Sequence, residues 1–356
     1  MEKLFMKGNE AIAEAAVRAG CRFFAGYPIT PQNEIPEYMS KRLPQVGGVF
    51  VQGGSEVASV NMVVGAAYTG TRAMTSSSGP GLSLKSEGLS SLAGSELPAV
   101  VVNIMRGGPG VGSIQAAQMD YLQATKASGH GGFRMLVYAP ATVQEAVDFT
   151  YLAFDKAMEY RTPVLISADG CIGSMMEQVE LPPMKEAEKE DLHFFASQYL
   201  NPKRKVITSM LPVESEQELY NKKLAAMYQK WEETEFLKEE YLLEDAEYVI
   251  AAYGTSARIA KSAIQILRGK GVKVGLFRPI TLYPFPYDSL RKLDEKQVKK
   301  VLCLEMSIPA QLVEDLKIGL EGRIPIACYG RSAGMIFTTE DVVEEIERQI
   351  RQEECE

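Results

Sequence analysis

The sequence predicts an α/β protein built around parallel β-sheets. Short β-branched or aromatic runs alternate with amphipathic stretches from residue 8 to 176, and the alternation resumes at residue 247. Strands that alternate with helices imply right-handed crossovers, which cover both faces of a parallel sheet. The charged segment between the two regions divides the chain into a larger α/β domain (1–180), a charged helical connector (181–245) and a smaller α/β domain (246–356).

The first domain starts with an amphipathic helix that Gly20 closes, because glycine accepts the left-handed conformation at the end of a helix. A second helix is expected from near Pro31, a third from Ser55, a fourth from Pro80 and a long one from Thr142 to Tyr160. Proline is tolerated in the first helical turn, which suits Pro80. Strands are expected at CRFFAGY (21–27), VFVQG (49–53), RAMTSSS (72–78), LPAVVVNIM (97–105), RMLVYAP (134–140) and TPVLISAD (162–169).

The connector contains one long charged helix over residues 214–236. Leu224, Met227, Tyr228 and Trp231 fall on one face of it, a stripe that indicates ordinary packing rather than a ligand site. The second domain then repeats the strand–helix pattern. Its strands are expected at EYVIAAYG (247–254), VKVGLFRP (272–279), VKKVLCLE (298–305) and RIPIACYG (323–330), with a final helix at TTEDVVEEIERQI (338–350).

Composition excludes several classes of function. The chain has 356 residues, of which 46% are hydrophobic and 24% charged, as in ordinary globular proteins. Its net charge of −8 argues against nucleic acid or an anionic membrane as a partner. Pro98 and Asn103 interrupt the longest apolar stretch, so no bilayer span is expected. With no targeting segment at the start, we expect a cytoplasmic protein.

The cysteines and histidines offer little material for a metal site. The five cysteines are scattered and none forms a CxxC pair, which argues against a locally encoded zinc site or iron–sulfur cluster. His130 and His193 are the two histidines. His130 stands in a glycine-rich SGHGG stretch, which favours a loop residue over a catalytic one. We therefore expect no metal bound by this chain.

Ligands of open parallel sheets bind beyond the carboxyl ends of the strands, and the loops there carry the candidate residues. In GYPITP (26–31), two prolines stiffen the backbone around Thr30, whose hydroxyl could donate to a carboxylate or carbonyl; spacing alone favours a rigid turn. In GGSEV (53–57), Ser55 is a plausible N-cap and Glu56 follows it. Glu56 is explained equally well by the helix dipole and by contact with a weakly basic ligand nitrogen.

Two further loops are rich in glycine. TSSSGPGLSL (75–84) places hydroxyls and glycines before a helix, which suits an anion or a ring but also a plain helix start. It is neither a Walker loop nor a GxGxxG loop. In RGGPGVGS (106–113), Arg106 ends a strand, where its guanidinium could pair with a carboxylate in bidentate fashion. A surface arginine on a flexible loop is an equally good interpretation.

Six segments carry a resemblance to a known family: KGNEAIAEAAVRAGC (7–21), GYPITPQNEIPEY (26–38), the Glu56 segment, TSSSGPGLSLKSEG (75–88), NIMRGGPGVGS (103–113) and the HG pair at 130–131. Together they resemble the α-type subunit of 2-oxoacid:ferredoxin oxidoreductases, and the resemblance runs almost unbroken through residues 1–180. Residues 245–267 and 271–286 resemble the transketolase C-terminal type of domain that accompanies it. The stretches 7–16, 53–62, 83–103 and 116–126 in combination resemble most the branched-chain member, which acts on 3-methyl-2-oxobutanoate.

The resemblance implies a thiamine-type pyrimidine-binding domain followed by a transketolase C-terminal-like domain. It implies that Glu56 contacts the aminopyrimidine ring of thiamine pyrophosphate and promotes loss of the thiazolium proton. It assigns Thr30 and Arg106 to the carboxylate of the oxoacid, and all three residues then count as catalytic. Ser78, Gly79 and Pro80 are expected to form part of the wall around the cofactor ring.

The implied reaction is oxidative decarboxylation of 3-methyl-2-oxobutanoate to an acyl-CoA, with electrons passed to ferredoxin. The chain lacks a GDG motif with an Asn-containing metal loop, so a β-type partner is expected to hold the diphosphate and Mg²⁺. Iron–sulfur clusters are expected on partner subunits, with a γ-type subunit and a small ferredoxin-like subunit completing an enzyme of anaerobic hosts. The alternatives are the same enzyme acting on 2-oxoglutarate and, in another class, a non-catalytic α/β scaffold subunit.

Overall fold

A computed structural model describes residues 2–185 and 207–355 of the chain; His193 and part of the expected connector lie outside them. The larger sheet has eight strands, seven in one path and β6 (Ser113–Ala116) paired with β5. The seven strands in spatial order are β13 (Thr281–Tyr283), β7 (Leu136–Tyr138), β8 (Pro163–Asp169), β5 (Ala99–Gly107), β4 (Ala73–Ser77), β2 (Phe23–Gly26) and β3 (Val49–Gln52).

Strand β5 lies near the middle of this sheet because its sequence suits burial on both faces. All nine of its residues are buried, and it pairs in parallel with β4 on one side and β8 on the other. The expected parallel arrangement holds for β2, β3, β4, β5, β7 and β8. The exceptions are β6 and β13, which run antiparallel to β5 and β7.

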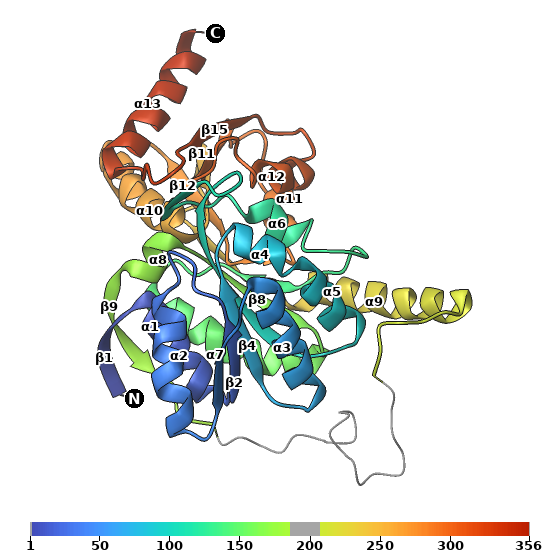
Figure 1. The fold of residues 1–356 in the computed structure, drawn as a ribbon. Helices are drawn as coiled ribbons and strands as arrows, with labels where there is room; N and C mark the ends of the chain where they lie inside the picture. The colour runs from blue at the N-terminus through green and yellow to red at the C-terminus, as the bar shows by residue number, and fades with distance from the viewer. Residues whose placement is uncertain (1, 186–206, 356) are drawn as a thin grey trace.

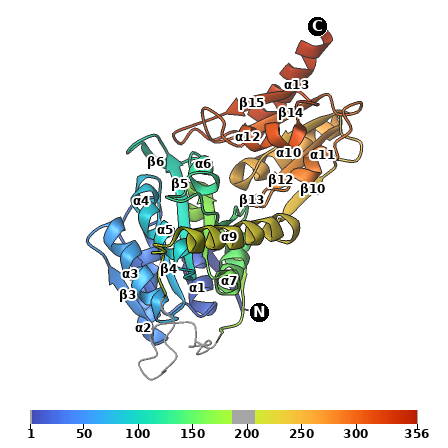
Figure 2. The same ribbon diagram turned by 90° about the vertical axis from the view of Figure 1, so that its right-hand side faces the viewer.

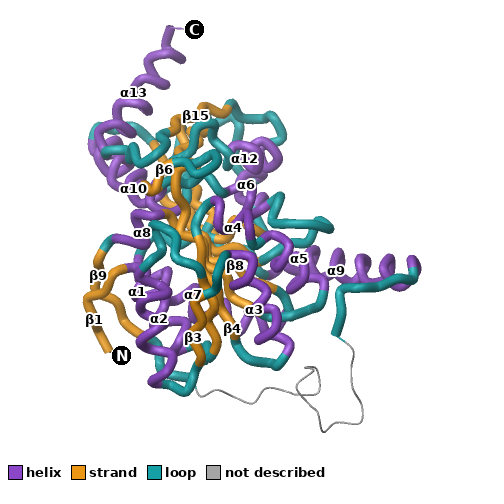
Figure 3. Tube along the Cα trace, viewed as in Figure 1, coloured by secondary structure: helices purple, strands orange, loops and turns teal. Residues whose placement is uncertain are grey.

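Helices cover both faces of the larger sheet (Figures 1 and 3). One face packs against α1 (Gly8–Arg18), α2 (Glu34–Gln45) and α7 (Val143–Tyr160). The opposite face packs against α3 (Glu56–Tyr68), the short α4 (Pro80–Leu84) and α5 (Ser86–Gly94). The expected end signals are present: Gly20 has a positive φ of 91° just after α1, and Pro80 is the first residue of α4.

A two-stranded ribbon beside the larger sheet was not expected from the sequence. The strand β1 (Glu2–Lys7) pairs antiparallel with β9 (Met176–Leu181), which follows α8 (Gly170–Ser174). Residues 2–7 show no clean alternation of apolar and polar side chains, so the sequence carried no strand signal there. The ribbon brings the beginning of the described chain next to residues 176–181.

The second sheet has five strands in the order β10 (Lys238–Tyr241), β12 (Val274–Pro279), β11 (Tyr248–Ala251), β14 (Lys300–Glu305) and β15 (Ile326–Gly330). All neighbours are parallel except β10 with β12. The helices α10 (Gly254–Gly269) and α13 (Thr339–Cys355) pack on one face. The short α11 (Tyr287–Arg291) and α12 (Val313–Leu320) pack on the other face.

The helix of the expected connector is α9 (Glu214–Thr234), which extends beside the larger sheet (yellow in Figure 2). Its predicted packing stripe is confirmed at Trp231, which is fully buried in the core on the α7 side of the sheet. The indole ring lies 5.3 Å from the ring of Tyr160 and 6.5 Å from that of Tyr283. Trp231 therefore fastens α9 to both α7 and β13.

Gln118 joins the two sheets. It follows β6 and is fully buried, and its side-chain amide donates to the carbonyl of Tyr253 at 2.8 Å. Its Oε1 accepts from the Ser256 hydroxyl at 2.7 Å and from the Met306 amide at 2.9 Å. Tyr253, Ser256 and Met306 all belong to the second sheet and its loops, so the segment after β6 is held by both parts of the molecule.

Near this contact, Glu305 is a fully buried carboxyl group at the end of β14. Its oxygens accept from the amides of Gln311 and Leu312 and from the Tyr253 hydroxyl. Burial raises the pKa of Glu305 to about 8, and the amides of Gln311 and Leu312 oppose that rise. Glu305 is thus largely protonated at neutral pH.

This protonation makes stability depend on pH. Because the folded pKa is raised, the stabilising contribution of Glu305 is complete below the unfolded pKa near 4.5 and is lost as pH rises through about 8. We expect Glu305→Gln to melt near the wild-type temperature at pH 5 and above it at pH 9. Thermal unfolding of both proteins across this range tests the prediction. An equal difference in melting temperature at every pH would contradict it.

Candidate functional site

The predicted site residues come together at one edge of the larger sheet. β2, β3, β4 and β5 are parallel and adjacent, so their carboxyl ends lie at the same edge. The segments that follow β2, β3 and β4 carry Thr30, Glu56 and the turn 78–80, and Arg106 is the penultimate residue of β5. The contacts below connect these loops into one cluster, which also contains residues that the sequence did not reveal.

Glu56 is the first residue of α3 and is only 6% exposed. Ser55 caps the helix as expected, with its hydroxyl accepting from the amide of Ala58 at 3.1 Å. The Glu56 carboxylate lies against Gly81 of α4, because a Cβ atom on Gly81 would be 2.9 Å from Oε1. A position in the first turn of a helix does not require a carboxylate to be buried. The helix start alone therefore does not explain Glu56.

The turn between β4 and α4 provides two buried hydroxyl groups. The Oγ atoms of Ser77 and Ser78 have no hydrogen-bond partner within residues 2–185 and 207–355. Gly79 has a φ of +46°, and a Cβ atom there would lie 3.3 Å from the side chain of Arg106. Buried polar groups are normally paired, so these hydroxyls suit contact with a bound molecule.

Arg106 is buried rather than mobile. It is 6% exposed, and its Nη1 donates to the carbonyl of Thr30 at 2.9 Å while Nη2 donates to the carbonyl of Val111 at 2.8 Å. Its Nε has no partner within the described residues. The interpretation of Arg106 as a surface residue on a flexible loop is therefore wrong. The guanidinium is fixed at the cluster and keeps N–H donors for an anion.

Thr30 lies in a loop that hydrogen bonds connect to α1 and β4. The Asn9 side chain donates to the carbonyl of Pro31 at 2.8 Å, and the Ser76 hydroxyl donates to the side chain of Gln32. The Thr30 hydroxyl accepts from the side chain of Asn33 at 3.3 Å. These bonds hold the Thr30 backbone beside Arg106.

Asp120 is a member of the cluster that the sequence analysis did not identify. The Asn103 side chain donates to its carboxylate at 2.9 Å, and Gly79 contributes a backbone hydrogen bond. Burial raises the pKa of Asp120, while Asn103, Gly79 and the charge of Arg106 oppose the rise. No local signal marks Asp120, because only the return of the chain through β6 brings it back to β5.

Lys85 is the second residue that was not assigned a role. It is fully buried, and its Nζ donates to Thr75 Oγ1 at 2.9 Å and to the Glu56 carbonyl at 3.4 Å. Burial lowers the pKa of Lys85 to about 8, and the charge of Glu56 opposes that effect. The cluster therefore contains a lysine buried beside its central carboxylate.

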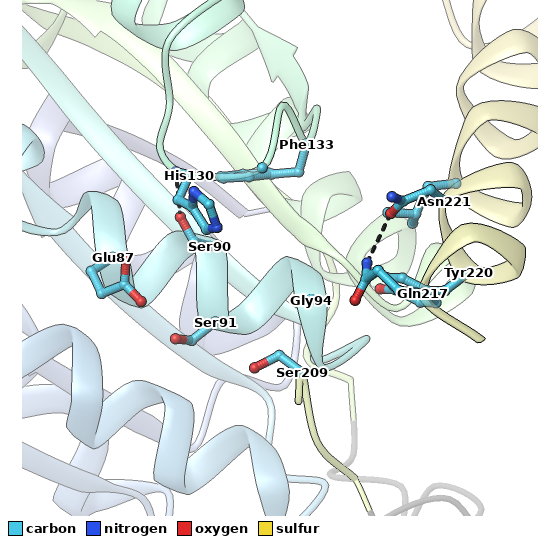
Figure 4. A pocket seen from close by; sticks show the side chains of 12 residues that line it. Glu87, Ser90, Ser91, Gly94, His130, Phe133, Ser209, Gln217, Tyr220 and Asn221 are labelled. Atoms are coloured by element: carbon cyan, nitrogen blue, oxygen red, sulfur yellow. Dashed lines mark hydrogen bonds between the residues drawn. The ribbon is translucent and has the colours of Figure 1, made fainter. Parts of the chain in front are cut away.

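His130 does not join the cluster. Its backbone amide donates to the Ser90 hydroxyl at 2.8 Å, and its side chain is exposed. Figure 4 shows the imidazole at a pocket between α5 and α9, which Glu87 and Tyr220 also line. This position agrees with the expected loop residue.

The comparisons with known proteins identify the family. Residues 14–240 match the family described as pyruvate flavodoxin/ferredoxin oxidoreductase, thiamine diphosphate-binding. The chain belongs to the 2-oxoacid:ferredoxin oxidoreductases. Residues 246–342 of this oxidoreductase subunit match a second family, pyruvate:ferredoxin oxidoreductase core domain II. The predicted fold class, a thiamine-type domain followed by a second α/β domain, is confirmed.

Similar proteins in this oxidoreductase family include subunits of two enzymes. The ketoisovalerate oxidoreductase subunit VorB of Methanothermobacter thermautotrophicus is 43% identical over 97% of both chains. The 2-oxoglutarate synthase subunit KorA of Methanocaldococcus jannaschii is 40% identical over 86% of this chain and 89% of its own.

A solved structure gives the same result for the fold. The 2-oxoglutarate:ferredoxin oxidoreductase from Magnetococcus marinus, with 2-oxoglutarate, coenzyme A and succinyl-CoA bound, superimposes with a TM-score of 0.84 at 27% identity. The match covers 98% of this oxidoreductase subunit and 65% of that chain. Among the helices of residues 2–185 and 207–355, none combines the length and apolar character needed to cross a bilayer.

Proposed function

We propose that this oxidoreductase subunit binds the aminopyrimidine ring of thiamine pyrophosphate and the carboxylate of 3-methyl-2-oxobutanoate. The observation that carries the proposal is the buried Glu56 carboxylate at the same sheet edge as the fixed Arg106 guanidinium. Family membership supports the cofactor, because residues 14–240 match a thiamine diphosphate-binding domain. The unpartnered hydroxyls of Ser77 and Ser78 suit contact with a bound ring, and the missing side chain at Gly81 leaves room for the Glu56 carboxylate.

Each residue has a defined task in this proposal. Glu56 hydrogen-bonds the ring nitrogen and controls its proton, while Ser78, Gly79 and Pro80 form the wall beside the ring. Arg106 and Thr30 hold the carboxylate of the oxoacid and so orient its keto carbon, which can lower the barrier by as much as ~7–11 kcal/mol. When bound, thiamine pyrophosphate supplies the carbon nucleophile and the electron sink for decarboxylation.

The choice of a branched-chain oxoacid rests on similarity and on charge. VorB, a ketoisovalerate oxidoreductase subunit, shares 43% of its residues with this chain over nearly its full length. A dicarboxylate such as 2-oxoglutarate needs a second cation besides Arg106. Lys85 is turned inward to Thr75 and the Glu56 carbonyl, so it does not offer that charge to a substrate. The similarity to KorA keeps 2-oxoglutarate as the alternative.

The rest of the reaction requires partners. We propose a β-type subunit that holds the diphosphate through Mg²⁺ and carries an iron–sulfur cluster, together with a γ-type subunit and a small ferredoxin-like subunit. Coenzyme A would accept the acyl group, and external ferredoxin would accept the electrons. The assembly would work in the cytoplasm. VorB is named as an oxidoreductase subunit and KorA as a synthase subunit, which supports an enzyme of several chains.

An oxoacid panel tests the substrate. The native complex is copurified through this chain under anaerobic conditions and assayed with coenzyme A and a viologen dye as electron acceptor. We expect kcat/KM for 3-methyl-2-oxobutanoate to exceed that for 2-oxoglutarate by about 100-fold, because the proposed site pairs one carboxylate with Arg106 and leaves a second carboxylate unpaired. The reverse order would establish 2-oxoglutarate as the substrate. Absence of dye reduction with every oxoacid would reject the catalytic proposal.

A further inference from the structure

Lys85 is unusual because its side chain is fully buried without a full ionic partner. Lysine is rarely buried in this way unless a carboxylate pairs with it. Its Nζ forms no salt bridge in the described part of the chain and instead donates to Thr75 Oγ1 at 2.9 Å and the Glu56 carbonyl at 3.4 Å. A buried charge that lacks a structural partner commonly marks a functional site.

The position of Lys85 connects three elements of the cluster. It follows the last residue of α4, and its side chain reaches both β4 at Thr75 and the first turn of α3 at Glu56. The Glu56 carboxylate lies against Gly81 of the same α4. The Lys85 side chain thus contacts the backbone of Glu56, and α4, which precedes Lys85, lies against the Glu56 carboxylate.

Electrostatics adds a second link between the two side chains. The charge of Glu56 favours the protonated form of Lys85, although burial lowers the pKa of Lys85 to about 8. Near neutral pH the lysine is therefore mostly an ammonium ion. At low effective dielectric the attraction between such a pair is stronger than at the surface and restricts where the carboxylate can point.

We propose that Lys85 is a positioning residue, whose buried ammonium ion holds the first turn of α3 and attracts the Glu56 carboxylate so that it faces the cofactor ring. The inference rests on the proposed function of Glu56. The proposed role differs from a purely structural one because Lys85 acts on the cofactor through Glu56. The effect of Lys85 on cofactor affinity should therefore disappear when the Glu56 charge is removed.

A double-mutant cycle tests this dependence. The Kd of thiamine pyrophosphate is measured by calorimetry on the assembled complex stripped of cofactor, for wild type, Lys85→Met, Glu56→Gln and the double variant. Methionine is an unbranched apolar side chain one atom shorter than lysine, so it suits a buried position but lacks the charge and the donors. We expect Lys85→Met to raise the Kd of thiamine pyrophosphate about tenfold when Glu56 is present and less than about twofold in the Glu56→Gln background.

Lys126→Met is the matched control. Lys126 pairs with the buried Asp315 of α12 at 2.6 Å, so its ion pair involves a helix of the second sheet rather than the cluster around Glu56. This control is expected to lower the melting temperature of the complex and to leave the Kd unchanged.

The affinity of the wild-type complex for thiamine pyrophosphate should also decrease as pH rises through about 8, where Lys85 loses its proton, and Lys85→Met should lack that decrease. Glu56 is the charged side chain that acts on Lys85 in this range.

The outcomes separate the two proposals. An unchanged Kd in Lys85→Met, or an equal loss in both backgrounds, overturns the positioning role of Lys85. If the wild-type complex does not bind thiamine pyrophosphate, or if Glu56→Gln binds it normally, the proposed function of Glu56 fails instead. A loss in the wild-type background that vanishes in Glu56→Gln supports the inference.

Discussion

Glu56→Gln is expected to lower turnover of the assembled complex by about 1000-fold, within the range of ~10²–10⁴ that proton transfer by a placed side chain contributes. Glutamine has nearly the shape of glutamate, so the fold around α3 and Gly81 should be preserved. What it loses is the negative charge and the ability to exchange a proton with a ring nitrogen. The measurement is steady-state dye reduction with saturating oxoacid and coenzyme A.

Glu87→Gln is the matched control, because Glu87 is an exposed glutamate near the start of α5. It should keep wild-type turnover. If Glu56→Gln also kept it while the melting temperature stayed unchanged, the chain would be a non-catalytic scaffold, which is the alternative from another class. A loss confined to Glu56→Gln excludes that alternative.

Arg106→Ala should reduce kcat/KM for the oxoacid by about 100-fold or more, mainly through a higher KM. The guanidinium is fixed by the carbonyls of Thr30 and Val111, so it meets a carboxylate without further ordering. Arg106→Lys should recover only part of the loss, since a lysine cannot bind a carboxylate in bidentate fashion. Kinetics with varied oxoacid at saturating coenzyme A provide both constants.

The control for this prediction is Arg258→Ala. Arg258 forms a surface ion pair with Glu177 at 2.6 Å, and such pairs contribute ~0–1 kcal/mol to stability. The KM of the Arg258→Ala enzyme for the oxoacid should therefore equal that of the wild type. An Arg106→Ala enzyme with unchanged KM would show that another group binds the carboxylate.

The sequence predicted much of this site because strand ends and loop chemistry are local properties. The run at 99–105 is apolar enough to be a central strand, so Arg106 had to emerge at its carboxyl end. Ser55 and Pro80 mark helix starts by local hydrogen bonding and backbone restriction, and both do start helices. Parallel topology then brings the loops together without any further information.

What the sequence did not reveal depends on contacts between distant segments. Asp120 reaches Asn103 only because β6 folds back on β5, and Lys85 is buried only because α3 and β4 close around it. A lysine in a polar stretch looks like a solvated residue until its surroundings are known. Arg106 posed the same problem, and burial was what decided between its two interpretations.

The strand β13 has a consequence for how this polypeptide can be divided. It comes from residues 281–283 yet forms the outer strand of the larger sheet, beside β7, while the chain around it belongs to the smaller sheet. A cut between residues 245 and 246 would leave the amino-terminal fragment with the bare edge of β7, open to pairing with other chains. The two fragments would then be poor autonomous folding units, and coexpression rather than separate refolding would be the route to a split protein.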